Sequence, residues 1–233
     1  MVKEGYWFGL PLLLLGLAGL LVRTPLTLAA GIVLIGLALF VFYFFRDPER
    51  IVPMDAGLVV SPADGRVVVV KDEENGGRAG KRISIFLAIW NVHVNRSPAA
   101  GTITRLDYKP GKFLAAWEET ASFENEQNVF ALASEHGPIM FKQIAGWVAR
   151  RVVAWKTAGD TVARGERIGL VRFGSRVDLW LPENAELAVK VGDNVRGGLS
   201  VLARILEGVP SKIVAPEKSR SAQQKLTEES GTA

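Results

Sequence analysis

The chain has 233 residues, 48% of them hydrophobic, and contains no cysteine. This length allows one compact domain with an appendage, and the lack of cysteine excludes disulfides, thiolate metal sites and cysteine nucleophiles. With only two histidines, His93 and His136, a multi-histidine metal centre is disfavoured. The net charge of +4 is compatible with an anionic membrane surface or with nucleic acid. No aromatic–basic nucleic-acid motif is present, so we expect no nucleic-acid partner.

Two apolar runs, Tyr6–Val22 and Leu26–Phe45, begin the chain and are separated only by Arg23–Pro25. The second run has the length at which a helix spans the hydrocarbon core of a bilayer. A cleaved signal peptide is disfavoured because no small-residue cleavage site follows the first run and the second begins at once. The pattern predicts a helical hairpin in the membrane. The first run is shorter and contains Pro11, so a re-entrant hairpin is the alternative to a transmembrane one.

The charges that flank the hairpin predict its orientation. Lys3, Arg46 and Arg50 lie beyond its outer ends, and only Arg23 lies in the loop. Positive charge is enriched on the cytoplasmic side of membrane proteins. We therefore expect both ends of the hairpin in the cytoplasm, and a domain held on the cytoplasmic face of the inner cell membrane.

The remainder of the chain reads as mainly β. Short Val- and Ile-rich runs alternate with Gly, Pro and Asp about every ten residues, which is typical of a barrel or sandwich. We expect a membrane hairpin and linker at 1–50, a β domain at 51–215 and a disordered polar tail at 216–233. The segment 121–134, "ASFENEQNVFALAS", fits helix and strand equally.

A Gly-Asp-x-Val-x-x-Gly pattern occurs twice, in 158–169 and in 191–202. The Asp and Gly positions favour tight turns, and the Val between them is expected in the core. The same pattern is common in lipoyl-like domains. A membrane-anchored lipoyl-like binding or adaptor module is therefore one alternative for the chain.

Four places on separate β segments could carry chemistry. They are Asp64 in "SPADG", His93 in "NVHVNRSP", the pair Arg150 and Arg151 in "QIAGWVARR", and the pair Gly174 and Ser175 in "RFGSRVDLWLP". An Asp, a His and a Ser can together activate a hydroxyl, because serine is a weak nucleophile until a base takes its proton. The Gly-x-Ser-x-Gly elbow of lipases is absent, since Arg176 follows the serine. A serine hydrolase that uses Ser175, His93 and Asp64 is therefore disfavoured, but it stays open as an alternative.

Seven motifs in the same order run through nearly the whole chain and carry a family resemblance. They are "FFRDPER", "SPADG", "NVHVNRSP", "PGKF", "ENEQN", "QIAGWVARR" and "RFGSRVDLWLP". In these motifs the chain resembles the short, proteobacterial and archaeal-type branch of the phosphatidylserine decarboxylase proenzymes.

The resemblance implies that the chain cuts itself between Gly174 and Ser175. Residues 1–174 would become the large chain and 175–233 the small chain, the two forming a heterodimer, with a homo-oligomer left open. Ser175 would become a pyruvoyl group, and neither a metal nor pyridoxal phosphate would be needed. The expected reaction converts phosphatidylserine, taken from membrane lipid, to phosphatidylethanolamine and CO₂ through a Schiff base on that group.

The resemblance also implies roles for the polar residues. Ser175 is the nucleophile, His93 the base and acid, and Asp64 the carboxylate that orients His93. Longer family members have a second histidine three residues after the first, where this chain has Arg96. We therefore expect His93 to serve both self-cleavage and decarboxylation; the alternative is that Arg96 and Asp64 activate Ser175.

Three arginines are the candidates for binding the lipid phosphate, because the guanidinium fork matches such anions. They are Arg150, Arg151 and Arg96. The second histidine, His136, lies in a turn-like segment, and we expect it to be structural.

Overall fold

The computed structural model describes residues 1–75, 77–115, 118–147, 151–172 and 175–206. Three of the sequence predictions lie outside these residues. They concern Gly174, Arg150 and the tail at 216–233.

The two apolar runs form a hairpin of helices, α1 (Lys3–Val22) and α2 (Pro25–Phe44). Each has 20 residues and is therefore about 30 Å long, enough to cross a hydrocarbon core. Thr24 caps α2 in a reciprocal box with Thr27, and Pro25 takes the first helical position, where its missing N–H costs nothing. The predicted hairpin is confirmed, although α1 begins three residues earlier than its apolar run.

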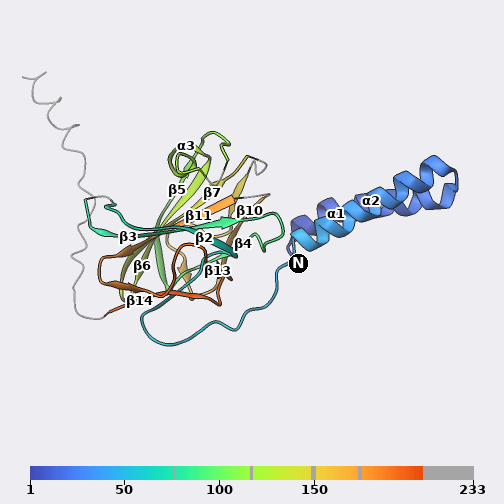
Figure 1. Cartoon of the computed structure of the whole chain (residues 1–233). Helices are drawn as coiled ribbons and strands as arrows, with labels where there is room; N and C mark the ends of the chain where they lie inside the picture. Colours follow the sequence, from blue (N-terminus) through green and yellow to red (C-terminus); the bar gives the residue numbers. More distant parts are fainter. Residues whose placement is uncertain (76, 116–117, 148–150, 173–174, 207–233) are drawn as a thin grey trace, which may run out of the picture.

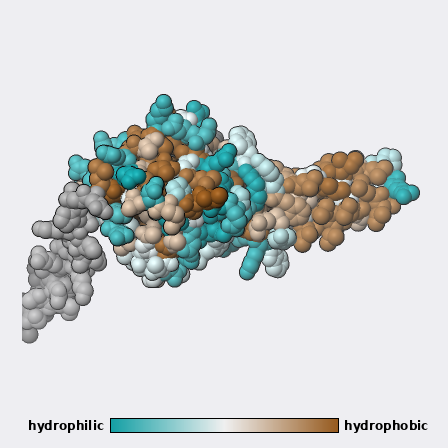
Figure 2. Space-filling model, turned by 90° about the horizontal axis from the view of Figure 1, so that it is seen from below, coloured by the Kyte–Doolittle hydropathy of each residue, from teal (hydrophilic) through white to brown (hydrophobic). Residues whose placement is uncertain are grey.

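The hairpin projects from the β domain, with an apolar surface along its length and a polar tip (Figures 1 and 2). Both helices are long and apolar enough to span a membrane. The arrangement indicates membrane association.

The rest of the described chain is built mainly from antiparallel strands, as predicted. One sheet has eight strands in the order β13–β2–β3–β11–β7–β6–β5–β9. Their bounds are β2 (Gly65–Asp72), β3 (Gly80–Leu87), β5 (Gly101–Lys109), β6 (Gln127–Ser134), β7 (Gly137–Ala145), β9 (Thr161–Val162), β11 (Ser175–Pro182) and β13 (Asn194–Val195).

Two three-stranded sheets complete the domain. The first has the order β1–β14–β12 and the second β4–β10–β8. Their bounds are β1 (Leu58–Val60), β14 (Val201–Ile205), β12 (Ala185–Leu187), β4 (Val94–Arg96), β10 (Arg167–Val171) and β8 (Val152–Ala154).

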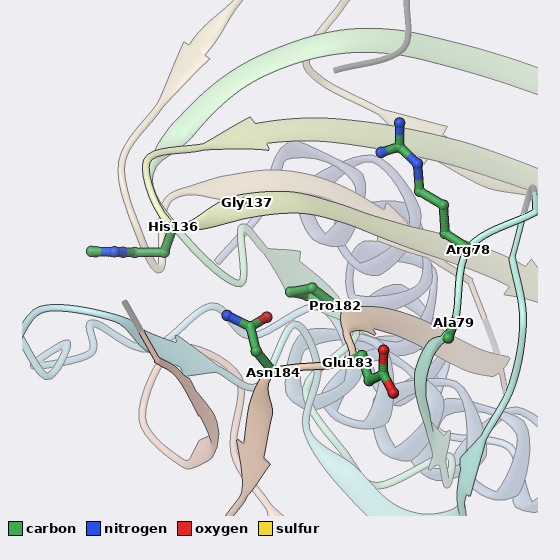
Figure 3. Close-up of a pocket in the computed structure, with 7 residues that line it drawn as sticks. All are labelled: Arg78, Ala79, His136, Gly137, Pro182, Glu183 and Asn184. Carbon is green, nitrogen blue, oxygen red and sulfur yellow. The ribbon is translucent and has the colours of Figure 1, made fainter. Parts of the chain in front are cut away.

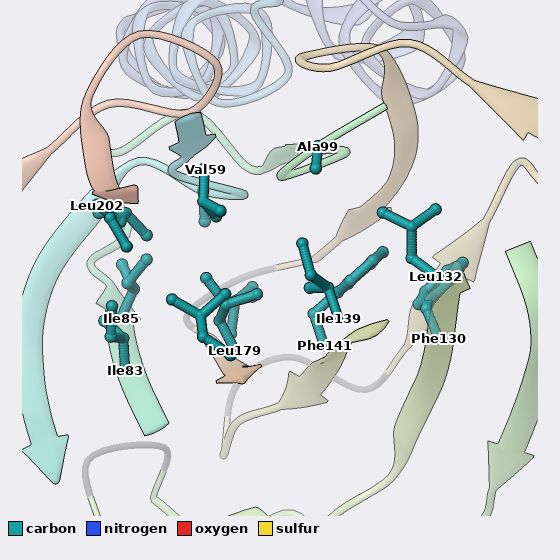
Figure 4. Packing of buried hydrophobic residues seen from close by; sticks show 14 of the residues in the cluster. Val59, Ile83, Ile85, Ala99, Phe130, Leu132, Ile139, Phe141, Leu179 and Leu202 are labelled. Carbon is teal, nitrogen blue, oxygen red and sulfur yellow. The ribbon is translucent and has the colours of Figure 1, made fainter. Parts of the chain in front are cut away.

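One hydrophobic core joins the three sheets (Figure 4). The eight-stranded sheet contributes side chains such as Ile85, Phe141 and Leu179, and the small sheets contribute Val59 and Ile168. Side chains alternate between the two faces of a strand. In β11 this alternation directs one set of residues into the core and the other set to the opposite face.

The ambiguous segment 121–134 contains one element of each kind. A single helical turn, α3 (Ala121–Glu124), is followed by β6. Neither period extends over the whole segment, which explains why the sequence pattern fitted both.

The repeated Gly-Asp-x-Val pattern forms equivalent turns at the two edges of the large sheet. β9 and β13 are its outermost strands, and their Val162 and Val195 are buried. The carboxylates of Asp160 and Asp193 each accept a hydrogen bond from the amide three residues earlier. The pattern is therefore turn chemistry, as predicted.

Candidate active site

Ser175 is the first residue of β11, a central strand of the large sheet. It lies opposite Leu87 of β3 and Ala145 of β7, and its side chain is fully buried. Its Oγ has no hydrogen-bond partner among the described residues. Buried hydroxyls are normally paired, so an unpaired one calls for a functional explanation.

His93 lies beside the segment that leads to Ser175. Its carbonyl accepts a hydrogen bond of 3.2 Å from the amide of Val171, at the end of β10. Ser175 follows Val171 by four residues. The pairing of β4 with β10 therefore places His93 beside the end of β10, four residues before Ser175. Its role as the base stays a prediction.

The imidazole of His93 is buried and held in one tautomer. Its Nδ1 lies 2.9 Å from the carbonyl oxygen of Asn91. Because a carbonyl can only accept, Nδ1 carries the proton and the lone pair of the neutral ring is on Nε2. Burial, with a smaller contribution from Arg46, lowers the pKa of His93 to about 4, so the ring is neutral at pH 7.

A buried chain of amides lies on the core face near Ser175. Asn128 donates to Gln143 at 3.0 Å, and Gln143 donates to Asn95 Oδ1 at 2.9 Å. Gln143 is in register with Val177, two residues along β11 from Ser175 on the same face. The Nδ2 of Asn95 is buried and has no partner among the described residues. It is a second unpaired polar atom in this region.

No role for Asn95, Gln143 or Asn128 could be proposed from the sequence. All three lie inside the quoted motifs. What the sequence did not reveal is that β4 crosses close to β7. Gln143 and Asn95 are 48 positions apart and meet only through that crossing.

Asp64 is buried, but its contacts differ from those predicted. Its carboxylate forms an ion pair with Arg50 at 3.0 Å and accepts the Gly197 amide at 2.7 Å. Neither described contact goes to His93, whose Nδ1 donates instead to the Asn91 carbonyl. The orienting role of Asp64 therefore stays a prediction.

Arg96 is bound to the linker that leaves the membrane. Its guanidinium donates to the Gly165 carbonyl at 3.0 Å, the Pro48 carbonyl at 3.0 Å and the Asp47 carboxylate at 3.2 Å. These contacts use both of its terminal nitrogens. Its predicted role in binding phosphate has no geometric support here.

Arg151 is exposed and lies at the same end of the domain as His93. It directly precedes β8, and its carbonyl accepts from the amide of Arg172, which follows β10. Its neighbour Arg150 lies outside the described residues. Of the two predicted phosphate ligands that the structure describes, Arg151 is exposed and Arg96 is buried. The phosphate-binding role of Arg151 stays a prediction.

The opposite face of β11 carries a buried ionic network. Arg176 bonds Asp178 at 2.6 Å and Ser84 at 2.8 Å, and Ser122 donates to Asp178 at 2.5 Å. These bonds tie the beginning of β11 to β3 and to α3. The network therefore fixes the strand that Ser175 begins. From the sequence, Arg176 was noted only as the residue that follows the serine, and Asp178 was missed.

A pocket of about 460 Å³ lies at the other end of β11, beside Pro182 and His136 (Figure 3). His136 Nε2 accepts a hydrogen bond of 3.1 Å from the Gly57 amide, in keeping with the expected structural role. The pocket is separated from Ser175 by the length of the strand and is distinct from the candidate site.

Comparison with known proteins gives a consistent result. A family model described as phosphatidylserine decarboxylase matches residues 37–203. A "Phosphatidylserine decarboxylase proenzyme" of Symbiobacterium thermophilum is 47% identical over 210 residues, which cover 88% of this chain and 95% of the relative. A proenzyme of the same name from Solibacter usitatus is 48% identical over 213 residues, covering 89% and 98%.

Proposed function

The chain belongs to the phosphatidylserine decarboxylase family, and on that premise we propose that Ser175 is the residue from which its pyruvoyl group forms. The chain is a self-processing, pyruvoyl-dependent carboxy-lyase that converts phosphatidylserine to phosphatidylethanolamine and CO₂. Neither the lipoyl-like adaptor nor the serine hydrolase is supported by the comparisons.

The buried, unpaired hydroxyl of Ser175 is the observation that carries the assignment. A buried donor without a partner costs about 1–3 kcal/mol. A ketone has no donor, so conversion of this residue to a pyruvoyl group removes the unpaired O–H. The carbonyl that replaces it suits a site where the Asn95 amide has an unused donor.

Self-cleavage then needs only residues of the chain. Ser175 Oγ attacks the carbonyl carbon of residue 174, His93 Nε2 takes the hydroxyl proton, and that proton passes to the departing nitrogen as the C–N bond breaks. Loss of the α-proton of residue 175 then breaks the Cβ–Oγ bond and leaves a carboxylate on residue 174. Addition of water releases ammonia and leaves the ketone. A neutral His93 is the form that can accept these protons.

The pyruvoyl group supplies a ketone that binds the substrate amine and withdraws electrons from the bond to the departing carboxylate. The chain's own residues bind and orient the lipid. We assign Arg151 to the lipid phosphate, since it is exposed and lies at this end of the domain. His93, buried beside the site, holds and returns the proton needed at the α-carbon.

The location of the site next to the hairpin fits a lipid substrate. Trp90 is 65% exposed, and its carbonyl accepts from Arg46, just past the end of α2. Exposed tryptophan side chains are enriched at the membrane interface. We infer that the hairpin lies in the inner cell membrane and that the domain, with cleaved fragments 1–174 and 175–233 paired, faces the cytoplasm.

Electrophoresis tests this assignment. We expect the purified protein to run as two bands, Ser175→Ala as one intact band without decarboxylase activity, and His93→Gln as mostly intact chain. Ser134→Ala is the matched control, because Ser134 is a hydrogen-bonded serine in the hairpin turn at the far end of the sheet. Cleavage of Ser175→Ala at the wild-type rate would exclude Ser175 as the nucleophile.

A further inference from the structure

The last turn of α2 packs into the β domain. Phe44 and Phe45 are fully buried, whereas most apolar side chains of the hairpin are exposed. The two phenylalanines belong to a separate hydrophobic cluster with Val2, Val92, Val94 and Leu170. The hairpin is therefore packed against β4 and β10, the strands that position His93.

Within this cluster the ring of Phe44 lies over the imidazole of His93. Their centroids are 4.2 Å apart and their planes are tilted by 34°. Phe45 meets Phe44 edge-on at 4.9 Å, and the Phe45 carbonyl accepts the Val2 amide at 3.1 Å. Both ends of the hairpin thus hold the Phe44 ring in place.

We propose that Phe44 is a positioning residue of the active site: its ring covers the His93 imidazole and fixes its plane, so that the membrane hairpin completes the catalytic site as well as tethering it. This proposal rests on the role of His93 as the base. Removal of the hairpin should therefore change the pKa and the ring orientation of His93, even where the β domain stays folded.

The charges around His93 agree with this geometry. Loss of contact with water is the largest cause of the lowered pKa of His93, and the hydrogen bond to Asn91 opposes it. Arg46, at the end of α2, lowers the pKa further. An ion pair of Glu4 with Arg172, at 3.8 Å, lies close by between α1 and the end of β10.

NMR titration of the full-length chain in lipid nanodiscs tests the proposal. In a Ser175→Ala, His136→Gln background only one histidine remains, so ¹⁵N-labelled histidine reports His93 alone. We expect Phe44→Ala to raise the pKa of His93 by at least about one pH unit toward its usual value. Phe44→Leu keeps apolar cover and should raise it less. The control is Leu37→Ala, two helical turns earlier at an exposed position, which should leave the pKa of His93 unchanged.

The pH profile of self-cleavage is the second readout. With Ser175 restored, the pH at which Phe44→Ala cleaves at half its maximal rate should shift upward together with the NMR value. An unchanged His93 pKa in folded Phe44→Ala would overturn the proposal. Wild-type cleavage by His93→Gln would instead refute the role of His93 as base, while the titration would still decide whether Phe44 covers the ring.

Discussion

At the level of single residues, the candidate site contains two buried atoms, Ser175 Oγ and Asn95 Nδ2, that have no hydrogen-bond partner in the described part of the chain. Each unpaired atom lowers the stability of the folded chain. A role in the reaction therefore explains its presence better than a role in folding does. One is the proposed nucleophile. The other is a donor whose direction is fixed, because Asn95 Oδ1 is already bound by Gln143. During attack, negative charge develops on the carbonyl oxygen of residue 174, and we propose that this donor stabilises it.

Asn95→Ala should therefore slow self-cleavage by about 100-fold, the usual effect of removing one donor to a developing oxyanion. Cell-free synthesis followed by a time course on gels measures the rate. Asn194→Ala, at an exposed position on β13, is the control. Wild-type kinetics in a folded Asn95→Ala protein would show that the amide has no part in cleavage.

The sequence allowed prediction of some of these residues but not others. Ser175 and His93 stand in motifs whose residue types match their chemistry, so both could be proposed directly. The role of Arg96 could not be read in this way, because a guanidinium binds a phosphate or a carboxylate equally well. Only the fold shows that Asp47 lies within its reach.

At the level of elements, an ionic clamp fastens the linker to the β domain. We define it as Asp47 and Glu49 with Arg96 and Arg167. Asp47 accepts a hydrogen bond from Arg96 at 3.2 Å and forms an ion pair with Arg167 at 2.6 Å, and Glu49 pairs with Arg167 at 2.7 Å. The clamp holds the end of the hairpin at the site, where Phe44 covers His93.

A double-mutant cycle tests the clamp in the uncut Ser175→Ala background. Asp47→Ala and Arg96→Ala should each lower the free energy of unfolding, with a coupling of about 1–3 kcal/mol, because their partly buried charges share one network. Urea denaturation of the four proteins gives the coupling. If Arg96 binds lipid phosphate instead, Arg96→Ala would raise KM in the cleaved enzyme and leave stability unchanged.

The elements that could be predicted from the sequence are those with a clear pattern of apolar residues. The hairpin was predictable because two long apolar runs leave few alternatives, and the β domain because Val and Ile alternate between turns. Segment 121–134 was not, since a single helical turn is too short to show a period. The contact between the hairpin and β4 was also beyond prediction. Phe44 lies in an apolar run where every side chain fits lipid.

At the level of the whole molecule, the membrane hairpin meets the β domain at His93, which is buried and neutral at pH 7. The pKa of His93 in the folded chain is about 4, below the usual histidine value of 6.5. Between these values the unfolded chain binds a proton that the folded chain does not. The contribution of His93 to the free energy of unfolding is therefore complete above about pH 6.5 and decreases as the pH is lowered toward 4.

Ser175→Ala protein should thus lose on the order of 3 kcal/mol between pH 7 and 4 through His93. Adding His93→Gln should remove that part of the loss, because glutamine does not titrate. Urea midpoints of both proteins across this pH range measure the difference. Parallel curves for the two proteins would mean that His93 is not buried in its neutral form.

Mass spectrometry of the mature small fragment tests most directly whether residue 175 becomes the reactive ketone. The predicted fragment begins at residue 175 and is lighter by one ammonia than a peptide that begins with serine. Its end should also react with a hydrazine. An intact chain, or a fragment with an ordinary serine at its start in fully active protein, would contradict the assignment of Ser175.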